Sequence, residues 1–498
     1  GHLGAGGLTV RVVDRLRRRA GPLVAAALYV GLGLAYAFRW GSVVRHTPSE
    51  WISPDDLSET FRASVALAHG HLNAIYQSSS RFVEFPGILI VLVPFAALYG
   101  SMHTTFIEIF DHQRLVTTPQ GLVAKTHTIW DAGTTASGAH NAMVYAVQPQ
   151  WFAALFPWVL IVSCVALFAL DALAERLGVP APRRAVLCVA QVVVLWPTVV
   201  FYGHPEDPVA LALALYALVF ALDGRWTGAG WLFGAAMAFQ PLVIVVFPIL
   251  VMMAGRRRAA ALSLRGALPL VALTVPSLAA NLHTTVHDLA TQPAFPDVPG
   301  TRQTPWTALA PSLGGRGTDT KIGGGPLRVA TLVLAVVVAF WARRWRPRPV
   351  MLVWAVALAL ALRSYTESVM TPYYMWPALA VALVVAGRAR TLGLWLAVAL
   401  AVAVTVTAQW YLGVFAWWGV DVGGISALLA VSAFPPAAEE EWVVPAPSPA
   451  AARATGAGRA RAGALPRAWA TGARRAGQPP RGKGSKAAKR RKRPATRR

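Results

Sequence analysis

Long apolar stretches alternate with short polar breaks from Gly21 to Phe434. An α-helix needs about 20 residues to cross the hydrocarbon core of a bilayer, and most of the stretches approach that length. The pattern therefore predicts an all-α fold, a polytopic transmembrane helical bundle of about 11 to 13 membrane segments. The candidate segments are Gly21–Phe38, Phe85–Met102, Trp151–Leu170, Ala185–Phe201, Val209–Leu222, Trp231–Ala254, Ala267–Leu282, Leu327–Trp341, Met351–Leu362, Met375–Ala386, Leu392–Val414 and Val422–Phe434.

The composition agrees with this class. The chain is 55% hydrophobic and 14% charged, which is more apolar than a typical soluble domain. Its net charge of +24 is concentrated in the short breaks and after Ala451, so the apolar body is not expected to bind nucleic acid. Cys164 and Cys188 both lie in apolar stretches, and we expect small core residues there, not a disulfide or a metal pair.

Arginine distribution predicts the topology. Residues 1–20 carry five arginines, and we expect the apolar stretch that follows to be a retained first span, not a cleaved signal peptide. Other arginine-rich breaks lie at 256–258, 343–346 and 388–390. Positive loops stay in the cytoplasm, so the outer loops become 41–84, 103–150 and 283–326. We predict a multi-pass protein of the cell (plasma) membrane with cytoplasmic N- and C-termini.

Two segments do not fit a simple count of crossings. Trp231–Ala254 has cytoplasmic signals at both ends, which predicts a broken hairpin with its apex at Gln240-Pro241, because proline cannot continue a helical hydrogen-bond ladder. Phe85–Met102 precedes a segment without excess Lys or Arg. The sequence leaves open whether it crosses the membrane or is re-entrant.

The chain changes character after the last apolar segment, so we divide it into 1–20, the transmembrane domain 21–434 and a tail 435–498. The tail is rich in Ala, Pro and Arg and ends in a run of Lys and Arg. Few large apolar residues remain to offset the entropy of ordering, so we predict a disordered cytoplasmic tail. Its basic residues either contact anionic membrane lipid or only fix topology and solubility.

The first candidate site follows the first span, at Ser53-Pro54-Asp55-Asp56-Leu57. One interpretation is a helix start, with Ser53 as the N-cap and a helix-like stretch through Ala68. The other is catalytic: a carboxylate within reach of a hydroxyl removes its proton as a new bond forms. The two interpretations are compatible, because a helix N-terminus also holds a carboxylate in place.

A second candidate is the break 203–208, Gly-His-Pro-Glu-Asp-Pro. A tight turn accounts for the glycine and prolines, and Asp207 could cap the next helix. Charge at a membrane boundary is costly, so His204, Glu206 and Asp207 together also suggest a cluster that binds a sugar, a phosphate or a metal. His-x-Glu alone is too little to predict a metal site.

A third candidate lies at 363–374. Arg363 and Glu367 are four residues apart, so on a helix they share a face and can pair. Tyr373 and Tyr374 would then belong to an interfacial aromatic belt. Alternatively, Arg363 binds a phosphate of a lipid donor and the two tyrosines line the pocket.

The outer loop 283–326 adds basic residues, with Arg316 as the candidate ligand for a phosphate. A long loop with little structure is either a binding lid or a connector. The chain has no Walker loop, Rossmann fingerprint, nucleophile elbow or zincin helix. We predict no obligatory cofactor, and a divalent metal is an alternative that no motif supports.

Together these motifs resemble the GT-C superfamily of integral membrane glycosyltransferases, and more narrowly its actinobacterial polyprenyl-phosphate-mannose-dependent mannosyltransferases. The residues that carry the likeness are Asp55-Asp56-Leu57, the Glu-Phe-Pro start of 82–94, Gly203 to Asp207, the stretch 223–234, and Arg363, Glu367, Tyr373, Tyr374 and Pro377. The likeness covers about residues 20–430. Many members carry a lysine where this chain has Gln240, so that role is not transferred.

The resemblance implies transfer of a sugar, mannose or a pentose, from a polyprenyl-phosphate donor to a lipid or cell-wall glycan acceptor on the outer face, with inversion. It implies Asp56 as the base, with Asp55 beside it. His204, Glu206, Asp207, Arg363, Glu367, Tyr373, Tyr374 and Arg316 would bind the donor or substrate. A transporter or lipid flippase is the alternative, and it would need charged groups along a path that reaches both faces.

Overall fold

The computed structural model describes residues 19–43, 51–52, 57–76, 85–97, 105–118, 121–132, 143–147, 149–291, 294–296, 303–313, 320–323, 325–410 and 412–433. The expectations for 1–18 and for the tail 435–498 therefore lie outside the described residues. Everything below concerns the part of the chain that ends at Ala433.

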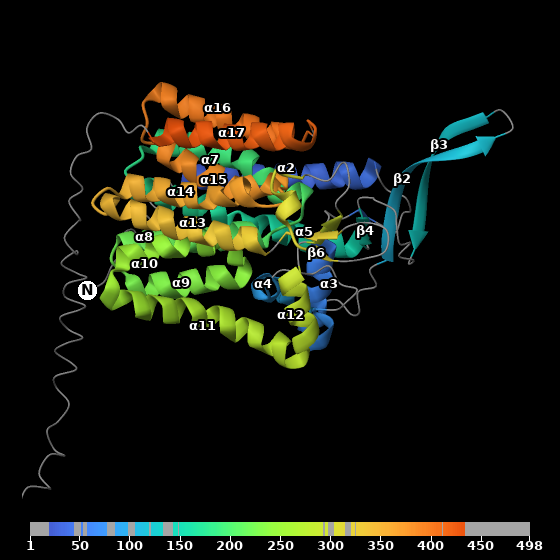
Figure 1. The fold of residues 1–498 in the computed structure, drawn as a ribbon, viewed down its shortest axis with the longest axis horizontal. Coiled ribbons are helices and arrows are strands. Elements are labelled where there is room, and N and C mark those ends of the chain that lie inside the picture. The colour runs from blue at the N-terminus through green and yellow to red at the C-terminus, as the bar shows by residue number, and fades with distance from the viewer. Residues whose placement is uncertain are drawn as a thin grey trace, which may run out of the picture. The chain divides into compact units, whose positions relative to one another are not determined.

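Helices make up most of this part (Figure 1). The helices before the 203–208 break are α2 (Ala20–Val43), α3 (Leu57–Ala68), α4 (Gly87–Ala96), α5 (Pro149–Ser163), α6 (Val165–Arg176) and α7 (Ala181–Trp196). The helices after it are α8 (Glu206–Leu222), α9 (Trp226–Phe239), α10 (Phe247–Ala254), α11 (Arg256–Ala280), α12 (Leu282–Thr291), α13 (Pro326–Ala342), α14 (Pro349–Thr366), α15 (Trp376–Ala386), α16 (Thr391–Thr407) and α17 (Val414–Ala433).

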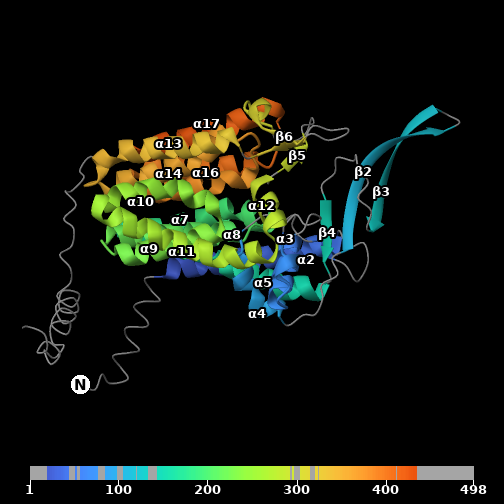
Figure 2. The ribbon, with the colours of Figure 1, turned by 60° about the horizontal axis from the view of Figure 1, so that its bottom comes forward.

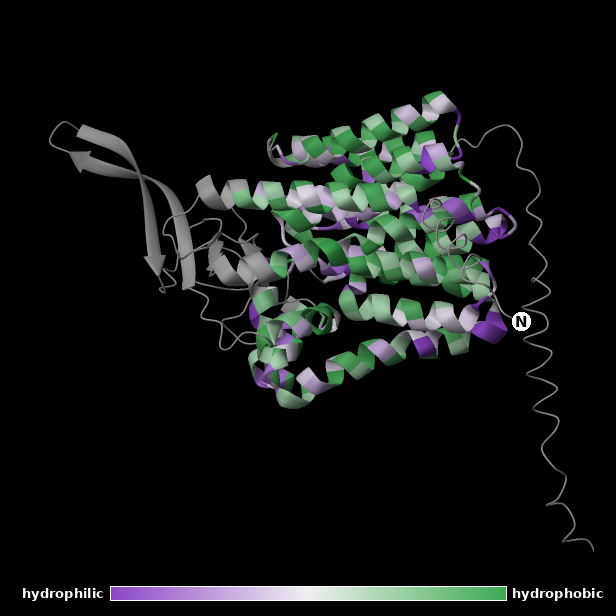
Figure 3. Cartoon of the chain, turned by 180° about the vertical axis from the view of Figure 1, so that it is seen from behind, coloured by the Kyte–Doolittle hydropathy of each residue, from purple (hydrophilic) through white to green (hydrophobic). Residues whose placement is uncertain are grey.

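The protein is a polytopic helical membrane protein, as the apolar pattern predicted. Among the described residues, seven helices are long and apolar enough to cross a membrane. They are Ala20–Phe38, Leu155–Arg176, Ala181–Phe201, Arg256–Ala280, Pro326–Trp345, Pro349–Thr366 and Phe415–Ala433. Shorter apolar helices pack among them, and hydrophobic side chains cover the flanks of the bundle while hydrophilic ones gather at the helix ends (Figure 3).

Arginines mark one end of the bundle, which we call the basic end. There α2 and α7 begin side by side, since Gly21 lies against Ala185. Arg183 on α7 donates to the carbonyl of Ala389, just before α16, and Arg346 after α13 donates to the carbonyl of Met252 on α10. These contacts place the arginine-rich breaks of the sequence at a shared end. We call the opposite end, where α7 stops and α8 starts, the outer end.

The segment 226–254 is a broken hairpin with its apex at Gln240, as predicted. Gln240 ends α9 in an extended conformation, and Pro241 starts a short 3-10 helix, Pro241–Val246, that leads into α10. The Gln240 amide reaches Asp207 at the outer end, whereas Met252 lies at the basic end. The chain therefore approaches the outer end along α9 and returns along α10.

Close packing of α9 on α11 comes from glycines four residues apart. A Cβ on Gly230 would lie 2.9 Å from the Arg265 Cβ, and one on Gly234 would lie 2.6 Å from the Gly266 carbonyl oxygen. Small residues at this spacing let helix backbones approach closely in membranes. Figures 1 and 2 both show α9 alongside α11.

The predicted span Phe85–Met102 is the short helix α4. Its ten residues extend about 15 Å, roughly half of a hydrocarbon core. The helix starts beside the outer end of α9, because a Cβ on Gly87 would lie 2.5 Å from the Ala238 carbonyl oxygen. Residues 98–102 of the predicted span lie outside the described residues, so crossing and re-entry both stay predictions.

The last two predicted spans were divided at the wrong place. Helix α16 ends at Thr407, not Val414, and α17 begins at Val414, eight residues before the predicted start. Gly413 has a φ of 104°, a conformation that favours glycine, so the chain turns there. Apolar residues lie on both sides of this turn, so the hydropathy pattern did not indicate it.

The outer segments carry regular structure where the sequence analysis expected loops. One antiparallel sheet has the strand order β1-β4-β2-β3, formed by Trp51–Ile52, Met143–Val147, Thr105–Thr118 and Gly121–Ala132. A second sheet has the order β5-β7-β6, formed by Ala294–Pro296, Thr320–Ile322 and Ser312–Leu313. Both sheets are formed by segments that connect helices, the first between α2 and α5 and the second between α12 and α13.

Candidate functional site

The structure gathers most of the predicted site residues at the outer end. Seven of them, from three sequence segments, form one connected cluster, which we call the outer cluster: His204, Glu206, Asp207, Arg363, Glu367, Tyr373 and Tyr374. Asp55, Asp56 and Arg316 lie outside the described residues, so their predicted roles stay predictions. Helix α3, expected to start after Asp56 and to run through Ala68, spans Leu57–Ala68.

The turn between α7 and α8 positions the first three residues. Helix α7 continues into a π-helical segment, Pro197–Phe201, and π-helical turns often occur at functional sites. Gly203 then has a φ of 73°, and the backbone N–H of His204 donates to the carbonyl of Thr198. The chain therefore folds back over the end of α7 and directs His204 and the start of α8 into the protein.

His204, Glu206 and Asp207 are buried, with exposed fractions of 5%, 0% and 7%. The Nδ1 atom of His204 lies 2.6 Å from Oε1 of Glu206. Asp207 accepts a hydrogen bond of 2.9 Å from the Gln240 amide, which the α9 hairpin supplies. Buried charge is costly unless it is paired or hydrogen-bonded, and each carboxylate has such a partner.

The prediction that Asp207 caps α8 is wrong. The N-cap is Pro205, and no side chain makes a capping hydrogen bond. Glu206 and Asp207 instead occupy the first turn of the helix, where the helix dipole favours negative charge. The Oδ1 atom of Asp207 accepts a hydrogen bond from the Gln240 amide at the end of α9, so Asp207 contacts a neighbouring helix and not the backbone of α8.

Aromatic rings join the turn to the end of α14. The ring of Tyr373 stacks on His204 with centroids 4.3 Å apart, and it also contacts Tyr202 at 5.1 Å and Tyr374 at 4.8 Å. The Arg363 guanidinium lies over the Tyr374 ring, 3.2 Å from its centroid. This cation–π contact carries the network from the carboxylates of α8 to the arginine of α14.

Arg363 and Glu367 form the predicted ion pair. The Arg363 Nε donates to Glu367, while Arg328 at the start of α13 lies 3.5 Å from the other carboxylate oxygen. Glu367 is 3% exposed and already lies past the end of α14, in an extended conformation. The backbone N–H of Glu367 still donates to the Arg363 carbonyl, and this last helical hydrogen bond of α14 keeps the two side chains close to each other.

The outer loop docks on this same place. Thr304 donates to the carbonyl of Glu367, Thr307 donates to the carbonyl of Ser368, and the Trp306 indole donates to the carbonyl of Tyr365. These bonds satisfy carbonyls that the end of α14 leaves without helical partners. The segment 303–307 is therefore a fixed part of the site, whereas the sequence predicted only a lid or a connector.

One carboxylate oxygen stays without a partner. Within the described residues, Oε2 of Glu206 is buried and makes no hydrogen bond. Arg363, Arg328 and Tyr373 are only partly buried and form the edge of the outer cluster. A hydroxyl-rich ligand that reached this edge would meet guanidinium donors and an aromatic face, while the fully buried Glu206 would act through His204.

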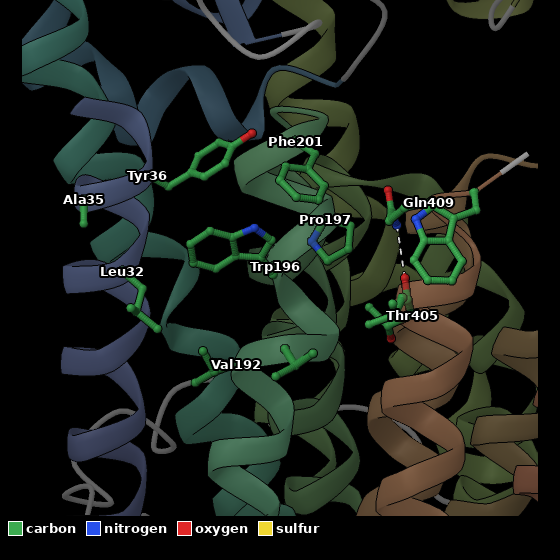
Figure 4. A pocket seen from close by; sticks show the side chains of 12 residues that line it. Leu32, Ala35, Tyr36, Val192, Trp196, Pro197, Phe201, Thr405 and Gln409 are labelled. Carbon is green, nitrogen blue, oxygen red and sulfur yellow. Dashed lines mark hydrogen bonds between the residues drawn. The ribbon is translucent and has the colours of Figure 1, made fainter. Parts of the chain in front are cut away.

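An apolar groove lies on the side of the bundle and includes Phe201, two residues before the break at Gly203. Its volume is about 740 Å³, and α2, α7 and α16 form its walls. Figure 4 shows Tyr36, Trp196 and Phe201 on one side of the groove and Gln409 on the other. Phe201 is followed directly by Tyr202, whose ring contacts Tyr373 of the outer cluster. A long apolar chain in the groove would thus end beside polar groups.

Sequence reasoning missed several residues of this region. The groove wall formed by Trp196, Phe201 and Tyr36 comes from helices that the sequence treated as plain spans. Aromatic residues at the outer ends of two neighbouring spans were the available signal. Arg328 and Gln240 were noticed, but their contacts with Glu367 and Asp207 depend on which helices pack together.

Metal binding and cysteine chemistry gain no support. In the described part of the chain, no group of three or more His, Cys, Asp or Glu side chains is arranged to hold a metal ion. The expectation that no metal or other cofactor is obligatory stays a prediction. Cys164 and Cys188 are free and buried, which confirms the expectation that they are separate core residues.

Comparison with known proteins adds no assignment. No protein-family model matches the chain, and no curated protein matches it. The interpretation of the site therefore depends on its geometry and on the resemblance in short motifs.

Proposed function

We propose that the protein is a membrane glycosyltransferase that moves a sugar, mannose or a pentose, from a polyprenyl-phosphate donor to a lipid or cell-wall glycan acceptor. The reaction takes place on the non-cytoplasmic face of the plasma membrane and inverts the anomeric centre. This proposal places the basic end, with both chain termini, in the cytoplasm, in accordance with the positive-inside rule.

The observation that supports it most is an apolar groove that includes Phe201, directly before Tyr202, whose ring contacts Tyr373 of the outer cluster. A polyprenyl chain is long and apolar, and its phosphate carries the sugar. The groove between α2, α7 and α16 offers an apolar wall from Leu32 to Phe201. The outer cluster offers hydrogen-bond acceptors and guanidinium groups at its edge. One ligand with an apolar tail and a polar head would fill both.

The chemistry needs a base, a leaving group and a way to hold the sugar. The acceptor hydroxyl oxygen attacks the anomeric carbon, the bond from that carbon to the phosphate oxygen breaks, and polyprenyl phosphate leaves with the electron pair. Asp56, the base implied by the resemblance, takes the hydroxyl proton. Arg363 and Arg328 stabilise the charge that grows on the phosphate, and the buried Glu206 holds His204 in position through their hydrogen bond.

A direct test uses membranes that contain the full chain and a radiolabelled polyprenyl-phosphate sugar. Extraction then measures label in acceptor lipid or glycan. We expect transfer by the wild type, and a loss of at least about 100-fold for Asp56→Asn. Glu206→Gln should lower transfer about tenfold, since it weakens the charge-assisted hydrogen bond that holds His204 in position.

The matched control is Asp223→Asn. It makes the same change in an acid at the basic end, where Asp223 pairs with Arg176, and transfer should stay within about twofold. Full transfer by a chain with both Asp55 and Asp56 changed would reject the base assignment. Absence of transfer by the wild type, combined with movement of labelled lipid between leaflets of a vesicle, would favour the flippase alternative.

A further inference from the structure

A second concave site lies at the basic end, far along α9 from the outer cluster. It has a volume of about 550 Å³ and is formed by the α8–α9 turn and the first turns of α9 and α11. Four of its lining residues are arginines, Arg225, Arg257, Arg258 and Arg265, and no Asp or Glu lines it. We call this site the arginine pocket.

The arginine charges in this pocket are not neutralised by acids. In the described part of the chain none of the four arginines forms an ion pair. The nearest acid in sequence, Asp223, is 2.5 Å from Arg176 and is therefore already paired. Arg225 and Arg258 instead lie over aromatic rings, those of Phe220 and Trp226.

Other donors converge on the same place. Helix α9 begins at Trp226, and its N-cap, Arg225, makes no side-chain capping bond, so the first backbone N–H groups of the helix have no side-chain acceptor. A cavity lined by four guanidinium groups beside a helix N-terminus offers several donors to one anionic acceptor.

The surroundings of the pocket indicate an amphipathic occupant. Towards the middle of the bundle, α9 and α11 continue with exposed apolar side chains: Trp231 is 47% exposed, Leu264 63% and Leu268 43%. Acyl chains would pack on these residues while a phosphate occupied the pocket. Helix α11 is long and apolar enough to cross a membrane, so acyl chains lie next to the pocket, whereas a soluble phosphate would contact the arginines alone.

We propose that the arginine pocket binds the phosphodiester headgroup of an anionic glycerophospholipid. Basic pockets between transmembrane helices suit such headgroups, because guanidinium groups bind phosphate in a bidentate manner. An arginine that served only to fix the orientation of the protein in the membrane would need only to lie at the membrane surface. The concave arrangement around an uncapped helix start is an additional property, and it is what selects phosphate.

The test is native mass spectrometry of the purified full chain in a mild detergent, with phosphatidylglycerol or phosphatidylcholine added. We expect retention of phosphatidylglycerol at concentrations where phosphatidylcholine is lost. Arg225→Gln combined with Arg265→Gln should weaken retention at least about tenfold, since charge-assisted hydrogen bonds are removed.

The matched control combines Arg344→Gln with Arg388→Gln. Both arginines lie at the basic end but do not line the pocket, so retention should change less than about twofold. Equal losses in the two double variants, or equal retention of phosphatidylcholine, would overturn the proposal. Unchanged elution and thermal unfolding of each variant keep a folding defect from imitating a binding defect.

A competition arm separates a lipid headgroup from free phosphate. Inorganic phosphate at millimolar concentration should not displace the bound phosphatidylglycerol, because it lacks the acyl chains. Displacement by phosphate at that concentration would overturn the lipid assignment. The test needs no sugar transfer, so its outcome is independent of the proposed function.

Discussion

The outer cluster and the arginine pocket treat charge in opposite ways. At the outer end, Glu206, Asp207 and Glu367 are almost fully buried, and each has a partner: His204 in the same turn, Gln240 at the end of α9, and Arg363 four residues earlier. At the basic end, Arg225, Arg257 and Arg258 are exposed, line an open pocket and have no acid partner among the described residues. The comparison teaches that charge count alone is a poor guide to a site.

Burial is what distinguishes the outer cluster from the arginine pocket. A buried charge remains only if the fold supplies a partner, so the outer cluster constrains how α8, α9 and α14 pack. The same holds at the basic end for Arg184, which is 7% exposed and pairs with the buried Asp171. The exposed arginines of the pocket need no partner, so substitutions there are expected to act mainly on ligand binding.

The largest expected effect is at Arg363. Arg363→Ala leaves Glu367 buried with only Arg328 at 3.5 Å, and loss of one partner of a buried pair costs about 3–5 kcal/mol. Titration with a denaturing detergent, followed by circular dichroism, measures the free energy of unfolding. Arg257→Ala at the basic end should cost less than about 1 kcal/mol. Equal losses at the two positions would contradict the comparison.

A smaller effect concerns α9, which joins the two ends. Gly234→Ala places a Cβ about 2.6 Å from the Gly266 carbonyl oxygen, and this overpacking should cost about 1–3 kcal/mol. The matched control is Gly31→Ala on α2, where a Cβ would meet nothing within 4 Å. The control should be neutral or stabilising. An unchanged unfolding midpoint for Gly234→Ala would show that α9 and α11 can separate freely.

Gln240 offers a third test of the outer end. Gln240→Leu removes the amide that donates to Asp207, and a buried carboxylate without that donor should cost about 1–3 kcal/mol. The matched control is Gln409→Leu, because Gln409 donates only to Thr405 in its own helix. If both variants unfolded alike, the Gln240–Asp207 contact would not hold the hairpin apex in place.

The smallest effect is a pH dependence at Asp288 on α12. Asp288 is 5% exposed, and burial raises the pKa of its carboxyl above the ordinary value, although nearby His287 opposes the shift. The folded state therefore binds the proton more tightly, so stability falls as pH rises through the ordinary pKa of about 3.9 and the raised value. Asp288→Asn should remove this loss and stabilise the protein slightly near neutral pH.

Thermal unfolding of both forms across pH 3 to about pH 8 measures this difference. The two curves should meet at the acid end, where Asp288 carries its proton, and separate above it. A gap that stayed constant with pH would mean that the carboxyl of Asp288 does not titrate differently on folding.

Much of the architecture could be predicted from the sequence because helix length and arginine placement are local properties. The apolar runs gave the helical membrane class, and proline after Gln240 gave the broken hairpin. The sequence did not predict the turn at Gly413 or the ten-residue length of helix α4, because both lie among apolar residues. Hydropathy alone does not mark a turn within an apolar run or the end of a short helix.

The candidate site divides in the same way. Residue types and spacing determined that His204, Glu206 and Asp207 share a turn and that Arg363 can reach Glu367. The tertiary structure alone decided that Tyr373 stacks on His204, that the Gln240 amide donates to Asp207, and that α2, α7 and α16 enclose an apolar groove. These contacts join residues far apart in the chain, and their formation depends on which helix faces pack together, which no local pattern specifies.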